Sequence, residues 1–130
     1  MNMTTEMARK ILSEAYINGR KRMNECKPVP MVVSDGNREY FIEDGVCGFA
    51  WVVVDYKKNG AKFINALKKM DLASNDINSF ADWKKHYPKG YSFWVAEGNQ
   101  SYDKKKAYAK GMVEVLEKYE ITCTYGYRLD

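Results

Sequence analysis

The sequence has few of the residues on which metal sites, disulfide frameworks and histidine catalysis depend. Its 130 residues include 3 Cys and 1 His. Cys26, Cys47 and Cys123 are widely spaced and form no CxxC pair, which disfavours a disulfide scaffold and fits reduced thiols. Their spacing with His86 supports neither a zinc site nor a Cys–His nucleophilic pair. We therefore expect no metal, no other cofactor and no enzymatic activity, and we expect Cys47 and Cys123 to be small core residues.

Long hydrophobic runs are also missing. The longest, from Val46 to Val54, is far too short to span a bilayer. The opening MNMTTEMARK has no apolar stretch typical of a signal peptide. We expect a soluble, cytoplasmic protein that makes no contact with a membrane, folded as a single domain over residues 1–130.

Strong charge of one sign is absent as well. The chain has 21 basic and 17 acidic residues and a net charge of +4. A dedicated nucleic-acid binder usually has a stronger, clustered basic face, so this balance argues against that class without excluding a polyanion. Weak nucleic-acid binding remains an alternative, through five lysines spread along the chain: Lys57, Lys58, Lys62, Lys84 and Lys85.

The pattern of apolar residues predicts an α/β protein of the mixed α+β kind. We expect a mixed sheet of about five strands, packed with an N-terminal helix and two crossover helices. Helices are predicted at 4–22, 61–70 and 101–120, with a short one at 77–88. Strands are predicted at 31–34, 39–43, 46–55, 91–97 and 121–129, the two short ones extending the sheet as antiparallel pairs.

The strand at 46–55 is apolar on both alternating faces, which predicts a central strand covered on both sides. Gly48 and Ala50 leave one of its faces thin, so a helix or a ligand can approach closely there. The cluster Arg20, Lys21 and Arg22 complements the C-terminal end of the first helix, which explains these charges without a partner.

The helix at 101–120 carries an unusual charge at its start. Lys104, Lys105 and Lys106 fall in its first turn, where the helix dipole is already positive. Ser101 is a good N-cap, and the corner of Glu97, Gly98, Asn99 and Gln100 connects it to the end of a strand. A strand end followed by a helix N-terminus is a known anion-binding geometry. A bound anion would explain the three lysines; a tolerated local cost is the alternative.

Some of the side chains near this corner are candidates for contacting a ligand. The buried stripe of the helix, projected back one turn, places Lys105 on the core side, where it would either reach a phosphate or extend to water. Arg128 near the end of the last strand could clamp a phosphate or carboxylate, or serve only as an edge charge, whereas for Arg38 we favour a surface salt bridge. Trp94 and Tyr102 lie nearest the corner and could stack on a ring, while Trp51 fits the core.

Several segments together resemble a group of small bacteriophage-encoded proteins of uncharacterised function. The matching segments are KPVPMVV, DGVCGFAWVVV, KFINALKKM, YPKGYSFWV, NQSYDKKKAYAKGMVEVLEKYEI and YRLD, and they cover most of the chain from residue 27 onward. The segment from Ile77 to His86 looks longer here, and Lys89-Gly90 replaces the usual GG. The resemblance implies an accessory protein that acts on the host, and it transfers no activity residue by residue.

Our first hypothesis is a phage accessory protein that binds a phosphorylated small molecule and sequesters a nucleotide-type signal of host immunity. Asn99, Gln100 and Ser101 would bind at the helix N-terminus, Lys105 and Arg128 would neutralise the charge, and Trp94 or Tyr102 would stack. A pocket shared between subunits would suit so small a chain, so we expect a homo-oligomer. A protein–protein inhibitor of a host factor is the main alternative.

Overall fold

The computed structural model describes residues 2–28, 30–36, 38–42, 45–73, 83–86, 90–98 and 101–129. Three helices lie in this part of the chain: α1 (Thr5–Glu25), α2 (Lys58–Ala73) and α3 (Tyr102–Lys118). A two-stranded ribbon joins β1 (Met31–Asp35) to β2 (Arg38–Ile42). The main sheet contains β3 (Gly48–Val54), β4 (Trp83–Lys85), β5 (Tyr91–Trp94) and β6 (Cys123–Leu129), in the order β4-β5-β3-β6.

The main sheet is antiparallel throughout, which corrects the predicted mixed sheet of about five strands. The two crossovers were predicted, but each one connects strands that are not neighbours. The segment containing α2 carries the chain from β3 past β5 to β4, and α3 carries it from β5 past β3 to β6. An antiparallel strand therefore separates each parallel pair, as in the split β-α-β-β-α-β arrangement. The order places β3 centrally, as predicted.

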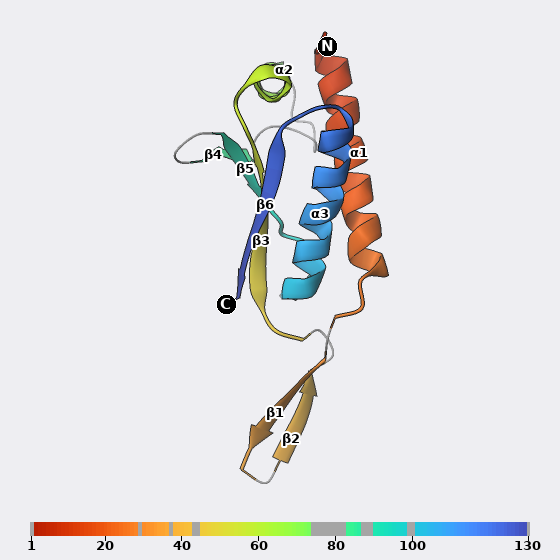
Figure 1. Ribbon diagram of the computed structural model, residues 1–130, viewed down its shortest axis with the longest axis vertical. Helices are drawn as coiled ribbons and strands as arrows, with labels where there is room; N and C mark the ends of the chain where they lie inside the picture. The colour runs from red at the N-terminus through yellow and green to blue at the C-terminus, as the bar shows by residue number, and fades with distance from the viewer. Residues whose placement is uncertain are drawn as a thin grey trace.

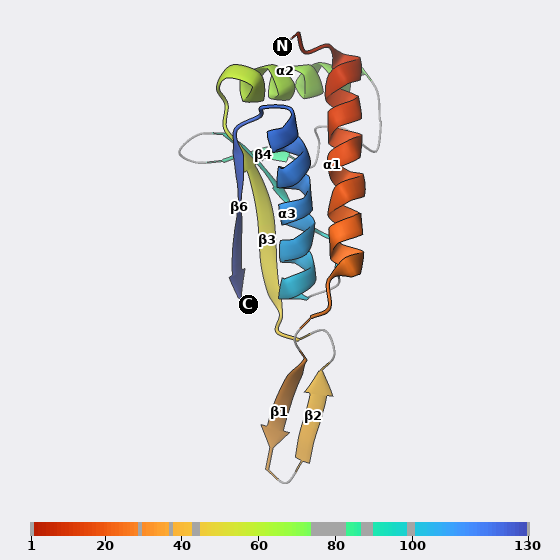
Figure 2. The same ribbon diagram turned by 45° about the vertical axis from the view of Figure 1, so that its right-hand side comes forward.

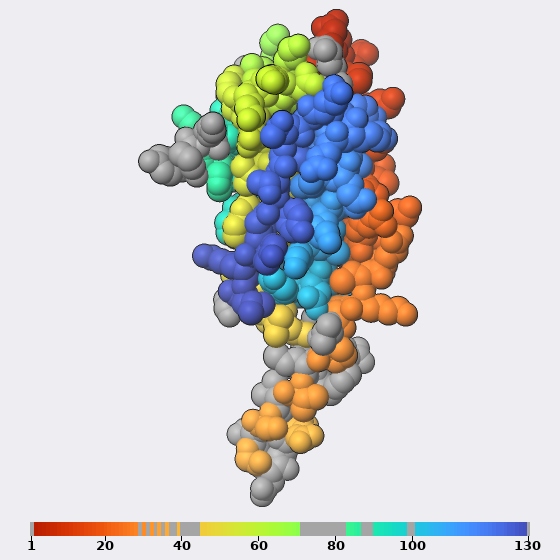
Figure 3. Space-filling model, viewed as in Figure 1, coloured from red at the N-terminus to blue at the C-terminus, as the bar shows by residue number. Residues whose placement is uncertain are grey.

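The ribbon of β1 and β2 stands away from the rest of the molecule (Figures 1 and 2). The space-filling view shows it as a narrow extension at one end of the body (Figure 3). The two strands pair with each other in antiparallel register, as expected, but the prediction that they extend the main sheet is wrong. The edges of the main sheet are β4 and β6, and β1 and β2 pair with each other and with neither of these strands.

One face of the main sheet packs against α1 and α3, which lie side by side (Figure 2). In β3 the residues turned to these helices, Ala50, Val52 and Val54, are fully buried. The small residues at the start of β3 do allow a close approach: a Cβ on Gly48 would lie 2.7 Å from the Tyr102 ring. The ligand alternative for this thin face is not needed, because α3 occupies it. In contrast to our expectation for β3, the opposite face is not covered by any of the described helices (Figure 1).

The remaining helix, α2, lies across one end of the sheet (Figure 2). Its buried Phe63 meets Trp83 edge-on at 6.5 Å between ring centroids. Trp83 belongs to β4 and pairs with Phe93, so residues 83–85 are not part of the short helix predicted for 77–88. In this strand Trp83 is buried, whereas Lys84 and Lys85 are exposed. Residues 77–82, 87 and 88 lie outside the described residues.

The ends of the helices follow their local sequence. The Thr4 hydroxyl accepts a hydrogen bond from the Met7 amide at 3.1 Å and caps α1. Arg20 and Arg22 near the end of α1 have partners within the chain, since they pair with Glu97 at 3.1 Å and with Glu114 at 2.9 Å. In the described part of the chain, no helix is long and apolar enough to cross a membrane.

Candidate functional site

Two cations and two aromatic rings from four different elements meet around Phe49. Phe49, Trp94 and Arg128 share the face of the sheet turned away from α1 and α3, and the Lys105 side chain reaches the Phe49 ring from α3. Arg128 of β6 pairs directly with Phe49 of β3, and its Cζ lies 5.1 Å from the Phe49 ring centroid. The Lys105 Nζ, from the first turn of α3, lies 5.7 Å from the same centroid. Trp94 at the end of β5 meets Phe49 edge-on at 6.0 Å. We call Phe49, Trp94, Lys105 and Arg128 the Phe49 cluster.

Lys105 reaches this cluster from the core side of α3, as its place in the helical stripe predicted. Only 9% of the residue is exposed, and its stem packs closely against Gly98, where an added Cβ would lie 3.5 Å from Lys105 Cγ. Among the ion pairs of the described residues, none includes Lys105 or Arg128. Within the described part of the chain, their charged groups lie against aromatic rings, an interaction weaker than a pair with a carboxylate. The site therefore favours an added anion.

Trp94 offers an exposed aromatic surface beside these cations. It is 46% exposed and stacks on Trp51 with centroids 4.8 Å apart and planes inclined by 23°. The Arg128 Cζ lies 5.8 Å from the Trp94 ring. Trp51, for which the sequence predicted a core position, is half-buried on the same face and lies over Gly126. A planar ligand could extend this stack without any change in the strands.

The N-terminus of α3, where the sequence placed the anion, has already used several of its donors. The Ser101 hydroxyl accepts from the Lys104 amide at 3.3 Å, which confirms it as the N-cap, and Ser101 is 1% exposed. The Tyr102 amide donates to the Val46 carbonyl at 3.0 Å. Asn99 and Gln100 lie outside the described residues. The side chains of the Phe49 cluster, more than the helix end, are thus positioned to bind a ligand.

Tyr102 does not share a site with Trp94, because the sheet separates them. The Tyr102 ring packs against Tyr127 at 5.7 Å on the helix-facing side. The Lys106 Nζ lies 4.2 Å from the Tyr127 ring centroid and 5.7 Å from that of Tyr102. The lysines at the start of α3 therefore have separate environments: Lys105 faces Phe49 and Lys106 faces Tyr127.

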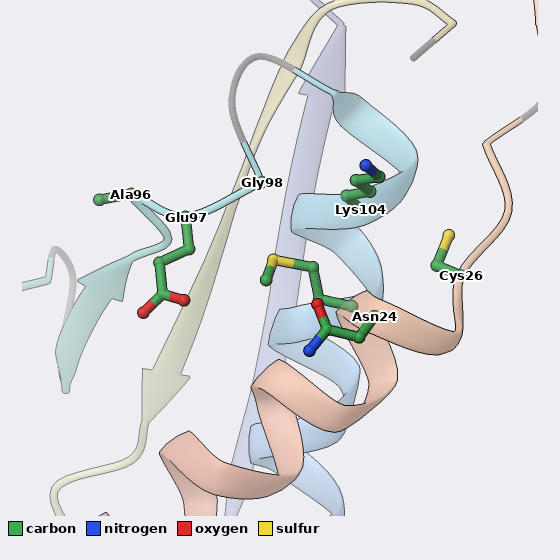
Figure 4. A pocket seen from close by; sticks show the side chains of 7 residues that line it. Asn24, Cys26, Ala96, Glu97, Gly98 and Lys104 are labelled. Atoms are coloured by element: carbon green, nitrogen blue, oxygen red, sulfur yellow. The ribbon is translucent and has the colours of Figure 1, made fainter. Parts of the chain in front are cut away.

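Lys104 lines a hollow of about 480 Å³ on another side of the corner. Figure 4 shows that Asn24 and Cys26 come from the end of α1, Ala96 to Gly98 from the segment after β5, and Lys104 from α3. Burial is the main cause that raises the pKa of the Cys26 thiol. Glu97 brings a carboxylate to this hollow, paired with Arg20 at 3.1 Å. A bound anion would meet that negative charge, so the Phe49 cluster is the better anion site.

The cysteines differ from one another in exposure. Cys47 is exposed, so its predicted core position is wrong: it precedes β3 and forms an isolated bridge with Ser101. Cys123 is half-buried, and burial raises the pKa of its thiol to about 12. Within the residues that the structure describes, no three His, Cys, Asp or Glu side chains gather to hold a metal ion.

Sequence reasoning missed Phe49, the residue on which the cluster is centred. A signal was present: Phe49 and Trp51 alternate with the small residues Gly48 and Ala50 in one strand. Alternation of large aromatic with small residues indicates one face closed by a helix and another with rings turned away from it. The apolar character of the whole segment concealed this difference.

Comparisons of the chain with protein-family models, with curated proteins and with solved structures found no match. Function must therefore be inferred from the residues of this chain.

Proposed function

We propose that the chain binds a phosphorylated small molecule of the nucleotide type at the Phe49 cluster. The observation that carries this proposal is the meeting of Lys105 and Arg128 on the Phe49 ring. Both ammonium and guanidinium groups lie within 6 Å of its centroid, and no ion pair of the described residues includes either one. A phosphate between them would supply the missing negative charge.

Each side chain then has a distinct role in binding. The guanidinium of Arg128 presents a planar fork of N–H donors suited to two oxygens of one phosphate. The ammonium group of Lys105 adds a point charge. Its position is restricted because the aliphatic stem of the side chain is buried. The exposed Trp94 ring provides the surface on which a base stacks. Together these groups recognise a charged part and a planar part of one ligand.

In the phage setting that the resemblance implies, binding without turnover would withhold a nucleotide-type signal from the host. Such a role requires tight binding and no catalytic group. A homo-oligomer fits the same proposal, because a second subunit could cover the exposed rings of the cluster. Native mass spectrometry, together with mass spectrometry of small molecules released on denaturation, would identify both the oligomer and any ligand that copurifies.

The proposal is tested by titrating a panel of mono-, di- and cyclic nucleotides into the protein by calorimetry. We expect Lys105→Met and Arg128→Ala each to weaken binding at least tenfold, since each removes a charge-assisted bond of about 1.5–3 kcal/mol. Methionine retains the packed stem of Lys105 while removing its charge. Lys106→Met is the matched control, because the neighbouring Lys106 places its ammonium group against Tyr127 and not against Phe49. Equal affinity of all four proteins would rule out this site.

A second function, binding of a host protein, is favoured by one observation. The ribbon of β1 and β2 stands off the body and exposes the apolar side chain of Val32, which is 58% accessible. An isolated two-stranded hairpin is marginally stable in water, so a partner surface would stabilise it. Host-lysate capture with the wild type and with Val32→Lys tests this function, and loss of a captured protein in the variant is the expected result.

A further inference from the structure

The side of the main sheet turned away from α1 and α3, which we call the open face, differs in character from the helix-covered side. Side chains alternate along a strand, so the pairing registers define which residues share this face. None of the described strand residues on it is acidic, and two are basic. The set consists of Phe49, Trp51, Val53, Lys84, Ser92, Trp94, Thr124, Gly126 and Arg128, of which Val53 and Ser92 are buried and the others half-buried or exposed.

The aromatic residues of the open face lie on the two central strands. Trp51 of β3 pairs directly with Trp94 of β5, and Phe49 lies two residues away along β3. The rings contact one another in series, since Phe49 meets Trp94 at 6.0 Å and Trp94 stacks on Trp51 at 4.8 Å. A four-stranded antiparallel sheet with aromatic side chains displayed in this way is a known platform for stacking the bases of single strands.

The sequence from Cys47 to Val54 partly matches the β-strand signature of RNA-recognition sheets, K/R-G-F/Y-G/A-F-V-x-F/Y. Gly48, Phe49, Ala50 and Val52 match it. The structure gives the physical reason: Gly48 and Ala50 admit α3, and Phe49 turns to the open face. Three positions depart from the pattern, with Cys47 in place of a basic residue, Trp51 in place of Phe and Val54 in place of an aromatic residue.

We infer that the open face binds a single strand of nucleic acid, about two or three nucleotides long at the contact. This inference rests on the proposed function, because the Phe49 cluster would hold one nucleotide of the strand. Trp94 and Phe49 stack on successive bases, and Arg128 and Lys105 contact the phosphate at one end. Lys84 lies on β4 opposite Ser92, two residues along β5 from Trp94, and contacts a phosphate farther along the strand.

The mild net charge of +4 is compatible with this occupant. Binding of duplex nucleic acid depends mainly on phosphate contacts and calls for a broad basic surface. Binding of a single strand draws much of its energy from base stacking on aromatic side chains, for which few cations suffice. The charge of the open face matches this chemistry, since its only charged strand residues in the described part are Lys84 and Arg128.

The experiment measures fluorescence anisotropy of labelled single-stranded RNA and DNA of one, two, three, four and eight nucleotides, with an RNA duplex for comparison. The full chain is used throughout. We expect affinity to rise with length up to about three or four nucleotides and to exceed that for the duplex. Trp94→Ala should weaken binding on the order of tenfold or more, and Trp94→Phe should restore most of it.

Lys84 and Lys85 provide a matched pair, since both are exposed neighbours on β4 but point to opposite faces of the sheet. Lys84→Ala should weaken binding of a four-nucleotide strand, reduce its salt dependence by about one phosphate contact, and leave binding of a mononucleotide unchanged. Lys85→Ala should change neither. Circular dichroism and thermal melts of every variant establish that it is folded.

The possible results separate this inference from the proposed function. If mononucleotides bind and longer strands bind no more tightly, the single-strand inference is overturned and the proposed function stands. If neither mononucleotides nor oligonucleotides bind, both are overturned. If oligonucleotides bind but Trp94→Ala has no effect, or Lys85→Ala weakens binding as much as Lys84→Ala, the strand lies elsewhere and the inference is overturned.

Discussion

Gly111 of α3 lies directly against Gly19 of α1, so closely that a Cβ on Gly111 would come within 2.9 Å of the Gly19 Cα. The same Cβ would lie 2.7 Å from the carbonyl oxygen of Asn18, whose side-chain amide donates to the Gly111 carbonyl at 2.7 Å. The absence of side chains at these two positions allows the helices to approach, and the Asn18 bond fixes their register.

Replacing Gly111 with alanine should therefore destabilise the protein. In an exposed helix this change is worth up to about 1 kcal/mol of added stability. Here the added methyl group meets backbone atoms that cannot move independently, so we expect a net loss of about 1–3 kcal/mol. Urea unfolding measures the effect, with the exposed neighbour Lys110→Ala as a control. A gain in stability for Gly111→Ala would contradict the close helix contact.

The position of the Trp51 indole requires a residue without a side chain in the neighbouring strand. A Cβ on Gly126 would lie 2.4 Å from Trp51 Cε2, so Gly126→Ala should displace the ring. We expect a shifted tryptophan emission, weaker near-ultraviolet signal from the stacked pair Trp51–Trp94, and a loss of about 1–3 kcal/mol. Thr124→Ala, an exposed position on the same face of β6, should leave both spectra unchanged and cost at most about 1 kcal/mol, the span of strand propensities. Unaltered spectra of Gly126→Ala would contradict this position for the indole.

Glu14 connects α1 to the end of α3. Hydrogen bonds from Lys118 and Tyr119 lower the pKa of its carboxyl group. A lowered pKa stabilises the fold at pH values above that of the unfolded carboxyl, about 4.3, and this stabilisation is lost as the pH falls through the folded value. Glu14→Gln should therefore lower stability at pH 7, by less than about 1 kcal/mol for so exposed a group, and the difference should shrink toward pH 3.

Urea unfolding of both proteins at pH 7 and pH 3 measures this difference. Glu117→Gln is a suitable control, since Glu117 is an exposed carboxylate on α3. A difference between Glu14→Gln and the wild type that stays constant from pH 7 to pH 3 would show that the carboxylate charge is not the cause.

The three thiols should differ in their rates of alkylation. The thiolate is the reactive form, and burial raises the pKa of Cys123 to about 12. Cys47 is exposed, whereas Cys26 and Cys123 are half-buried. With iodoacetamide at pH 8 we expect Cys47 to react first and Cys123 last. Peptide mass spectrometry at successive times measures the alkylation of each cysteine. Denatured protein provides the control, in which the three rates should become similar, and a fast Cys123 in the native protein would contradict its environment.

The helices and the central strand could be predicted because each rests on a local signal. Thr4 and Ser101 are strong N-caps, and the apolar stripe that runs through Met112 and Leu116 placed Lys105 on the core side. The strand order could not be predicted, because hydrophobic periodicity does not show which strands pair. The same pattern fits neighbouring parallel strands and the observed split arrangement equally well.

The candidate site was predicted in part for a similar reason. Trp94, Lys105 and Arg128 were singled out one by one, and the structure brings them together around Phe49. That meeting depends on the pairing of Phe49 with Arg128, two residues far apart in the chain, which no local pattern contains. Tyr102 is close to the same corner in sequence, yet the sheet lies between it and Trp94.

The ribbon of β1 and β2 has a consequence for how the protein unfolds. Its strands pair with each other, while the core is built by α1, α3 and the main sheet. Opening the ribbon therefore exposes little of that core and needs only a fraction of the global unfolding free energy. Its amide protons should exchange with solvent long before those of β3, and a protease should cut there first, leaving α1 and the β3–β6 body held together as a nicked but folded pair of fragments.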